Sequence, residues 1–383
     1  MGKLGDIISK AEIIKCGNNV YPVFSMTMHD GIMLQSERFK KSLASTDTSE
    51  YKVVKNGQLV VGFPIDEGVL YIQKYDFEGI MSPAYDIWNV DYSIVTDKYL
   101  EYALHSPQSM QYYSSKLRGT TARRRSITKD DLLNLTFPLP PLETQRRIAA
   151  NLDKVTNLID TCNAILEKLD LLVKSRFVEM FGDIYTNKHN FPIQQLANYI
   201  DFLTSGSRGW AKYCVDDGSE WFITIKNVKD CRISTDNIQP VNAPDNMEAK
   251  RTKVEEGDLL ISITADLGRT GVVTREIAEH GAYINQHLTC IRLDKTKLIP
   301  LYVAYFMESK SGTPQFEAKN QTGVKAGLNF DSIKSLKLLV PPLALQEQFA
   351  AFVEQTDKSK LAVKKVLEKA ETLKKALMQE YFG

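Results

Sequence analysis

Two 43-residue segments of this 383-residue sequence repeat each other at a constant offset of 201 residues. Residues 140–182 read PPLETQRRIAANLDKVTNLIDTCNAILEKLDLLVKSRFVEMFG, and residues 341–383 read PPLALQEQFAAFVEQTDKSKLAVKKVLEKAETLKKALMQEYFG. The segments share 14 identical positions without a gap, so that PPL, Q, AA, LEK and FG stay in register. A period this long is too large for a solenoid repeat, and it therefore predicts the duplication of a whole domain.

Weaker matches extend the duplication to the segments that precede the repeats. VKNGQLVVG at 54–62 resembles VEEGDLLIS at 254–262, and YLEYAL at 99–104 resembles YVAYFM at 302–307. The offset drifts by a residue or two there, as loop insertions would cause. We therefore expect a globular domain at 1–140, a helix at 141–182, a second globular domain at 183–341 and a second helix at 342–383.

Both repeated segments carry apolar residues at alternating steps of four and three, which is the spacing of a coiled-coil seam. The pattern predicts one long helix per copy, begun by Pro-Pro and ended by Phe-Gly. One such helix alone would suggest oligomerisation, but two equal helices in one chain most simply pair with each other, antiparallel. Their length would then set the spacing between the two globular domains. The predicted seam residues are Ile148, Leu152, Val155, Ile159, Leu166, Leu169, Val173, Phe349, Val353, Val363, Leu367 and Leu377.

The globular segments are rich in short β-like runs bounded by turn residues. Examples are QLVVGF (58–63), EWFITIKNV (220–228), GDLLISIT (257–264) and LTCIRL (288–293), with helical stretches at 97–117 and 300–310 among them. The predicted fold class is a pair of α/β (α+β) globular domains joined by two long antiparallel coiled-coil helices, in a pseudo-twofold internal duplication. Each domain is large enough to bury its own core.

Sequence motifs for catalysis are missing. There is no GxxxxGK[ST] phosphate loop, no GxGxxG turn, no GxSxG elbow and no HxxxH pair of metal ligands. Five cysteines without a CxxC pair argue against a disulfide framework or a zinc ribbon, and fit the cytoplasm. No apolar run approaches the roughly 20 residues of a membrane span, and the N-terminus lacks a signal-peptide pattern. We therefore expect a cytoplasmic, non-catalytic protein with no metal or cofactor of its own.

The net charge of +1 conceals a segregated distribution of charge. No acidic residue occurs from Tyr102 to Lys129, and GTTARRRS (119–126) is small, polar and cationic, as suits contacts with DNA phosphates and base edges. TSGSRGWAKY (204–213), TADLGRTG (264–271), NQH (285–287) and KNQTGVKAGLN (319–329) offer similar groups in the second copy. An ordinary solvated loop is the competing interpretation of each. The candidate DNA-binding residues are Lys116, Arg118, Thr120, Arg123, Arg124, Arg125, Ser205, Ser207, Arg208, Trp210, Lys212, Tyr213, Arg269, Gln286, His287, Asn320, Gln321 and Lys325.

The duplicated pattern PPLxxQxxIAxxL…LEKL…FxxMFGD resembles the specificity (S) subunit of type I restriction–modification systems. TSGSRGWAKY, followed by NMEAKRTKVEEGDLLISITADLGRTG, also resembles the target-recognition domains of that family. The resemblance covers the whole chain. It implies that each α/β domain reads one half of a split double-stranded DNA target, and that the helices set the length of the unread spacer.

The same resemblance implies the partners of the chain. Two methyltransferase (M) subunits would dock on the helices and use AdoMet to methylate adenine N6, and two restriction (R) subunits would cleave unmethylated DNA with ATP and Mg²⁺. The chain itself would recognise DNA without catalysis, and the target adenine would leave the base stack to reach the M subunit. Two other functions fit the same sequence. One is a coiled-coil adaptor with protein-binding globular ends, and the other is a specificity subunit of a related system that is not type I.

Overall fold

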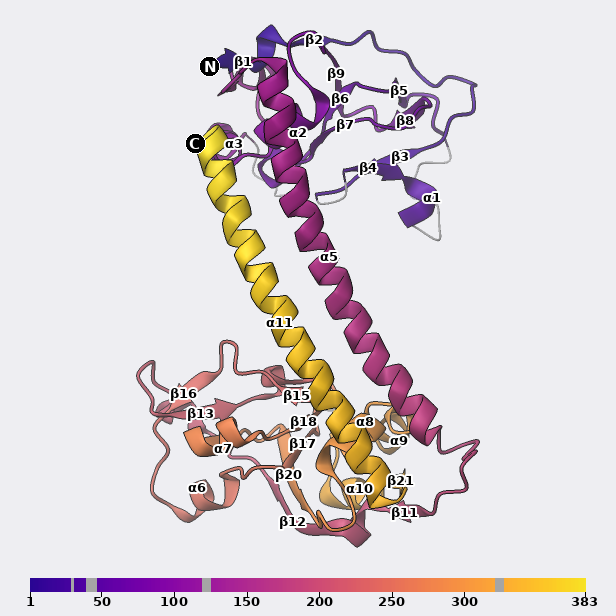
Figure 1. Ribbon diagram of the computed structural model, residues 1–383, viewed down its shortest axis with the longest axis vertical. Coiled ribbons are helices and arrows are strands. Elements are labelled where there is room, and N and C mark those ends of the chain that lie inside the picture. Colours follow the sequence, from indigo (N-terminus) through magenta and orange to yellow (C-terminus); the bar gives the residue numbers. More distant parts are fainter. Residues whose placement is uncertain (29–30, 39–46, 119–124, 321–326) are drawn as a thin grey trace. The chain divides into compact units, whose positions relative to one another are not determined.

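The computed structural model describes residues 1–28, 31–38, 47–118, 125–320 and 327–383, which form two compact units. Unit 1 contains residues 1–164 and 364–383, and unit 2 contains residues 165–363. Two helices of 40 residues each, α5 (Leu142–Phe181) and α11 (Leu343–Phe382), contribute to both units (Figure 1). Each unit thus holds one α/β domain and a segment of each long helix. Within the described residues, no helix is both long and apolar enough to cross a membrane.

The central antiparallel sheet has the same strand order in both units. In unit 1 the order is β2 (Ile8–Lys10), β9 (Asp86–Val90), β6 (Leu59–Val61) and β7 (Leu70–Ile72). In unit 2 it is β12 (Ile200–Ser205), β20 (Leu288–Leu293), β17 (Leu259–Ser262) and β18 (Thr270–Val272). The duplication predicted from the helices therefore extends to the topology of the sheets.

Smaller elements surround each sheet. In unit 1 these are the pairs β1 (Gly2–Lys3) with β10 (Thr136–Phe137), β3 (Phe24–Met26) with β4 (Ile32–Leu34) and β5 (Lys52–Val54) with β8 (Gly79–Met81), and the helices α1 (Gln35–Arg38), α2 (Asp97–Leu104), α3 (Pro107–Lys116) and α4 (Lys129–Leu133). In unit 2 there are two strand pairs, β11 (Ile193–Gln195) with β21 (Lys337–Leu339) and β14 (Val228–Lys229) with β15 (Arg232–Ile233). A mixed sheet contains β16 (Gln239–Val241), β13 (Glu220–Ile223) and β19 (Ala282–Ile284). The short helices are α6 (Met247–Thr252), α7 (Arg275–His280), α8 (Pro300–Met307), α9 (Thr313–Lys319) and α10 (Phe330–Lys334).

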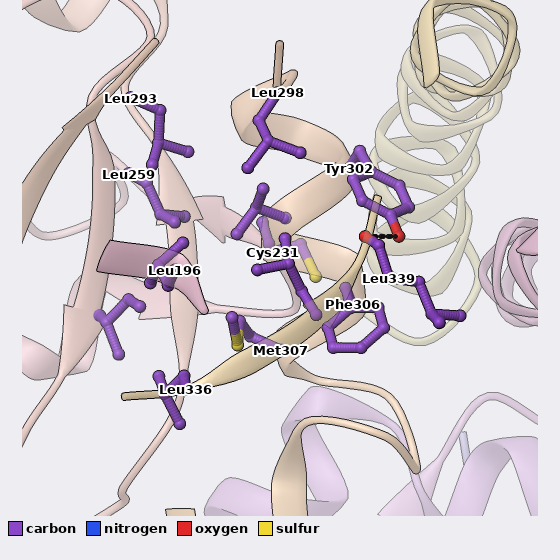
Figure 2. Packing of buried hydrophobic residues seen from close by; sticks show 14 of the residues in the cluster. Leu196, Cys231, Leu259, Leu293, Leu298, Tyr302, Phe306, Met307, Leu336 and Leu339 are labelled. Atoms are coloured by element: carbon purple, nitrogen blue, oxygen red, sulfur yellow. Dashed lines mark hydrogen bonds between the residues drawn. The ribbon is translucent and has the colours of Figure 1, made fainter. Parts of the chain in front are cut away.

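Strand β17 shows how the sheet of unit 2 is buried on both faces. Side chains alternate along a strand. Leu259 and Ile261 therefore enter the core cluster that contains α8, whereas Leu260 enters a second cluster with β13 and β19. Figure 2 shows part of the first cluster, including Leu259 from the sheet and Tyr302 from α8. Burial on both faces explains why Leu259, Leu260 and Ile261 form a continuous apolar run instead of an alternating one.

The stretch 97–117, predicted as helical throughout, is two helices. Helix α2 ends at Leu104, and α3 begins at Pro107. Ser106 caps α3, because its hydroxyl accepts a hydrogen bond from Ser109 N at 3.2 Å. Proline suits the first turn of a helix but lacks the N–H that would continue a preceding one, which explains the break.

A buried glutamine ties the start of α5 to the domain of unit 1. Gln145 is fully buried, and its Oε1 accepts a hydrogen bond from Thr96 N at 2.9 Å. Its Nε2 donates to Ile94 O at 2.9 Å and to Pro140 O at 2.8 Å. The side-chain amide thus joins two backbone groups just before α2 to one backbone group just before α5.

Gln346, the repeat equivalent of Gln145, does the same for α11 in unit 2 and is also fully buried. It accepts from Ile299 N at 2.9 Å and donates to Lys297 O at 3.2 Å and Pro341 O at 2.9 Å. A buried tyrosine adds a second tie nearby, since Tyr302 Oη donates to Leu339 O at 2.9 Å (Figure 2). In unit 1 the corresponding bond runs from Tyr99 Oη to Pro138 O at 2.7 Å.

None of the predicted seam residues is exposed, as each is buried or half-buried. In unit 1, Ile148 and Leu152 of α5 share a core cluster with Met378 and Phe382 of α11. In unit 2, the chain direction of the two helix segments is antiparallel, because Lys360 bonds to Asp170 while Phe349 packs on Phe181 at a ring distance of 5.6 Å.

Phe177 and Phe181 lie outside the predicted seam but are also buried. Phe181 packs against Tyr302 of α8 with ring centroids 4.7 Å apart. The buried face is therefore wider near the helix end, because α5 contacts the globular domain there as well as the other helix. A seam defined by helix–helix spacing alone does not include this second contact.

Lys360, a polar residue among the seam positions of α11, is held by acidic residues in unit 2. Only 9% of its side chain is exposed, and its ammonium bonds to Asp170 and lies 3.9 Å from Asp357. Asp357 in turn bonds to Arg232 of β15. The four charges alternate in sign, so Lys360 belongs to an ionic cluster that favours one register of the two helix segments.

Replacing Gln346 by Met should lower the stability of the chain by on the order of 2–3 kcal/mol, because it removes three hydrogen bonds and leaves one backbone N–H and two backbone carbonyls without these partners. The measurement is urea unfolding followed by circular dichroism. Gln348→Met is the matched control, since Gln348 is exposed on the same helix and should change stability by less than about 0.5 kcal/mol. Equal effects of the two variants would contradict the role given to Gln346.

Replacing Lys360 by Met should leave the unfolding midpoint unchanged or raise it, because an apolar side chain avoids the desolvation cost of a nearly buried ammonium. Removing its partner in Asp170→Ala should lower stability by about 1 kcal/mol, a modest amount because the Asp170 side chain is largely exposed. Both variants can be compared in the same urea titration. A larger loss from Lys360→Met than from Asp170→Ala would show that the ion pair itself stabilises the helices.

Candidate DNA interface

Several candidate loops of unit 2 meet at one edge of the central sheet. Ser205 at the end of β12 pairs with Thr289, and Ser262 at the end of β17 pairs with Leu288 at the start of β20. Because these strands are antiparallel neighbours, the loops that follow β12 and β17 and the turn that precedes β20 lie at the same edge. The predicted segments 204–213, 264–271 and 285–287 therefore converge, although they are far apart in sequence.

Gly206 makes the closest backbone approach at this edge. Its N–H donates to Leu288 O at 3.1 Å, and Ser207 N donates to Ile284 O at 2.9 Å. A Cβ at position 206 would lie 2.0 Å from Asn285 O, which no side chain can tolerate. The Gly-Ser composition of this loop is thus required by its packing against the 284–288 turn.

Polar side chains from the three loops form a connected row. Arg208 Nε donates to Gln286 Oε1 at 2.6 Å. Gln286 Nε2 lies 3.2 Å from His287 Nε2, and His287 Nδ1 lies 2.7 Å from Thr264 Oγ1. A backbone hydrogen bond joins a fourth segment to the same edge, since Leu328 N donates to Ile263 O at 2.9 Å. The segment that leaves α9 at Asn320 therefore returns to this edge at 327–328.

Two predicted contact residues of this loop are buried, and for them the prediction of direct DNA contact is corrected. Trp210 is 2% exposed and stacks on Phe222 at a ring distance of 5.6 Å, so its indole belongs to a core cluster with Tyr283. Ser207 is also 2% exposed and its hydroxyl lies 3.1 Å from Thr252 Oγ1. Both residues shape the loop from inside.

The other candidates of unit 2 differ in how far their charges are compensated. Arg269 is paired with Asp266 at 2.7 Å, whereas the exposed Lys212 lies over the half-buried ring of Tyr213 at 4.8 Å. Ser205 is half-buried, and its carbonyl accepts a hydrogen bond at 2.7 Å from Arg251 Nη1. Arg251 was not predicted from the sequence, because it lies in helix α6 about 45 residues from the loop that it supports. Gln321 and Lys325 lie outside the described residues.

The corresponding loop of unit 1 is anchored at its base. Arg118 and Ser126 form an antiparallel bridge, and Ile65 N donates a hydrogen bond to Arg125 O at 3.2 Å. The Arg125 guanidinium lies 2.7 Å from Asp66 and 3.1 Å from Glu67. Arg118 is exposed. Thr120, Arg123 and Arg124 lie outside the described residues.

The basic charges of the acid-free stretch 102–129 are therefore partly neutralised in the folded chain by acidic residues from other segments. Lys129, for instance, lies 3.1 Å from Asp86. Its aromatic residues also have core roles, since Tyr113 is fully buried and Tyr112 Oη donates to Asp131 O at 2.9 Å. The exposed Lys116 lies over the Tyr112 ring, 5.9 Å from its centroid.

Lys52 is a basic residue of unit 1 that the sequence did not single out. Its ammonium donates to Tyr85 O at 2.6 Å. Burial lowers the pKa of Lys52, and the nearby charges of Lys129 and Lys10 add to this effect while Asp86 opposes it. Lys10 ends β2 and Asp86 begins β9, so these groups lie at the edge of the sheet that corresponds to the loop edge of unit 2. Only the pairing of distant strands brings them together.

Residues 2–171 and 235–374 match the family described as the type I restriction modification DNA specificity domain. These ranges cover most of the sequence. The chain belongs to this family.

Relatives named as specificity subunits of type I restriction enzymes support the assignment. The StySPI specificity subunit of Salmonella potsdam is 26% identical over 273 residues, which is 66% of this chain and 58% of that protein. The EcoKI specificity subunit of Escherichia coli K12 is 25% identical over 256 residues, 63% of this chain and 54% of that protein. The chain therefore aligns with little more than half the length of these specificity subunits.

Two solved structures share the fold. A chain from a structure entitled "Structural basis underlying complex assembly and conformational transition of the type I R-M system" matches 99% of this chain with a TM-score of 0.59 and 18% identity, and 96% of that chain is covered. The type I restriction-modification S subunit from M. genitalium matches 100% of this chain with a TM-score of 0.58 and 15% identity, and 95% of it is covered. The α/β domains and long helices are thus the fold of known specificity subunits.

Replacing Trp210 by Ala should destabilise this specificity-family chain by about 3–5 kcal/mol, because it empties the centre of a core cluster. Trp210→Phe keeps a ring in the cluster and should cost less. Tyr185→Ala is the control, because Tyr185 is an exposed aromatic residue of the same unit and should change stability by less than about 0.5 kcal/mol. Urea unfolding measures all three. If Trp210→Ala were as stable as the wild type, the core role given to Trp210 would be wrong, and Trp210 would again be a candidate for DNA contact.

Proposed function

We propose that the chain is the DNA sequence-specificity subunit of a type I restriction–modification complex and that it is not itself catalytic. The observation that carries the proposal is the repetition of one sheet, with polar loops at the same edge, in two units of a chain that belongs to the specificity family. Specificity subunits are the relatives named for this sequence. Recognition of double-stranded DNA is the role that such loops suit, since they present amides and guanidinium groups, which can bond to base edges.

Each unit would read one half of a bipartite target, and the long helices would set the length of the unread spacer. Loop anchoring supports equivalent roles for the two edges, because Ile65 bonds to Arg125 in unit 1 as Leu328 bonds to Ile263 in unit 2. The side chains at the two edges differ, with Arg125 beside Asp66 and Glu67 in one and Arg208 beside Gln286 in the other. The proposal therefore predicts half-sites of different sequence.

The outer face of the helices supports docking of two copies of one partner. Ile165 and Leu172 of α5 are exposed in unit 2, and their repeat equivalents Val366 and Leu373 of α11 are exposed in unit 1. Exposed apolar residues that recur in both copies are typical of a binding surface rather than of chance. We propose M subunits as these partners. They would supply AdoMet, and R subunits would join with ATP and Mg²⁺.

Methylation mapping tests the function directly. The chain is co-expressed with its M subunit in a host that lacks adenine methylation, and modified adenines are located by single-molecule sequencing. The expected result is a two-part motif with a spacer of fixed length and one methyl-adenine in each half. A single continuous motif would contradict the two-reader proposal. Co-expression without any sequence-specific methylation would favour the adaptor function.

The double variant Ile165→Glu, Leu172→Glu should abolish co-purification of an M subunit with this half of the chain, because it places two charges in an apolar contact. The same change at Val366 and Leu373 should remove the second copy. Leu361→Asp is the matched control, because Leu361 is equally exposed but its repeat equivalent is already Asp160. Stoichiometry is measured by native mass spectrometry. An unaltered complex in both double variants would place the M subunits elsewhere.

A further inference from the structure

Arg208 is an exposed cation held in a defined orientation at the loop edge of unit 2. Its Nε is bonded to Gln286, but among the described residues no carboxylate lies within ion-pairing distance of its guanidinium. Residues 321–326, outside the described part, contain no Asp or Glu. Arg269 and Arg251 at the same edge are occupied, by Asp266 and by the Ser205 carbonyl respectively. The terminal nitrogens of Arg208 are thus available as cationic donors at this edge.

The hydrogen bonds behind Arg208 can run in only one direction. An arginine Nε–H is always a donor, so Gln286 must turn its oxygen toward Arg208 and its NH₂ toward His287. His287 Nε2 must then accept a hydrogen bond, which places the ring proton on Nδ1, facing Thr264 Oγ1. Gln286, His287 and Thr264 therefore form a chain of hydrogen bonds that holds Arg208 Nε and so fixes the orientation of the guanidinium plane.

The backbone around Arg208 is fixed as well. Gly206 is pressed against Asn285, and Ser207 N is bonded to Ile284 O. Gly209, which follows Arg208, has a φ of 75° in the left-handed region and precedes the buried Trp210. Arg208 thus projects from a rigid turn between two constrained neighbours, so that little conformational freedom is left to lose on binding.

We propose that Arg208 reads a guanine in the half-site bound by unit 2, with Gln286, His287 and Thr264 as positioning residues. The inference rests on the proposed DNA-recognition function. With Nε held by Gln286, the remaining terminal N–H groups form the fork that matches O6 and N7 of guanine in the major groove. A phosphate contact would need only a charge near the backbone, whereas a chain of hydrogen bonds through three side chains controls orientation, which base reading requires.

The test compares methylation motifs of the whole complex, formed by the full chain and its M subunit. Arg208→Ala should relax one G·C position in one half of the motif, with a loss of discrimination of about 10- to 100-fold there, and leave the other half unchanged. Gln286→Ala should weaken the preference at that same position while the overall extent of methylation is kept. Arg275→Ala is the control, because Arg275 is an exposed arginine of unit 2 that is paired with Glu279 at 2.7 Å. It should leave the motif unaltered.

Four other results would contradict the assignment of Arg208, the identity of its base, the kind of contact or the proposed function. An unchanged motif in soluble Arg208→Ala and Arg208→Lys complexes would show that Arg208 reads no base. Relaxation at an A·T position would refute guanine as the ligand, and a uniform loss of methylation at all sites would indicate a phosphate contact instead. A wild-type complex without a bipartite motif would overturn the proposed function itself, and this failure is seen before any variant is made.

Discussion

The buried glutamine at the start of each long helix is the contact on which the architecture depends. Gln145 and Gln346 each join the helix, the proline segment before it and the segment that leads into α2 or α8 through three hydrogen bonds. A buried amide whose partners are lost is costly, so the helix cannot rotate or shift relative to its domain without breaking several bonds at once. A long helix can set the position of a recognition surface only if its junction with that domain is rigid.

The two units keep this scaffold and vary what it presents. At one equivalent cross-strand position, unit 1 has Gln58 bonded to Asn89 at 2.8 Å, whereas unit 2 has Asp258, fully buried, in a two-bond contact with Arg292 at 2.8 and 2.9 Å. The sheet tolerates either pair because both satisfy their hydrogen bonds. Loops at the sheet edge are freer still, which is where recognition residues are expected to diverge.

Prediction from sequence succeeded where a signal is local or periodic, and failed where it depends on distant partners. The run LTCIRL became strand β20, and the predicted seam residues lie on the covered faces of α5 and α11. Trp210 looked like a DNA contact because its neighbours are loop residues, yet it stacks on Phe222 twelve positions away. Arg125 looked free of acids because none occurs from residue 102 to residue 129, yet Asp66 and Glu67 lie beside it.

The sequence by itself determined the duplication, the two long helices and some of the strands, such as β17 and β20, because repeats and side-chain periodicities are properties of order along the chain. Tertiary structure alone decided which loops share an edge and which of their side chains face outward. Strand pairing brings residues from positions 208, 264 and 286 within hydrogen-bond distance of their neighbours, and no spacing rule relates those positions. A guanidinium acquires a defined direction only when a partner from a distant strand holds it.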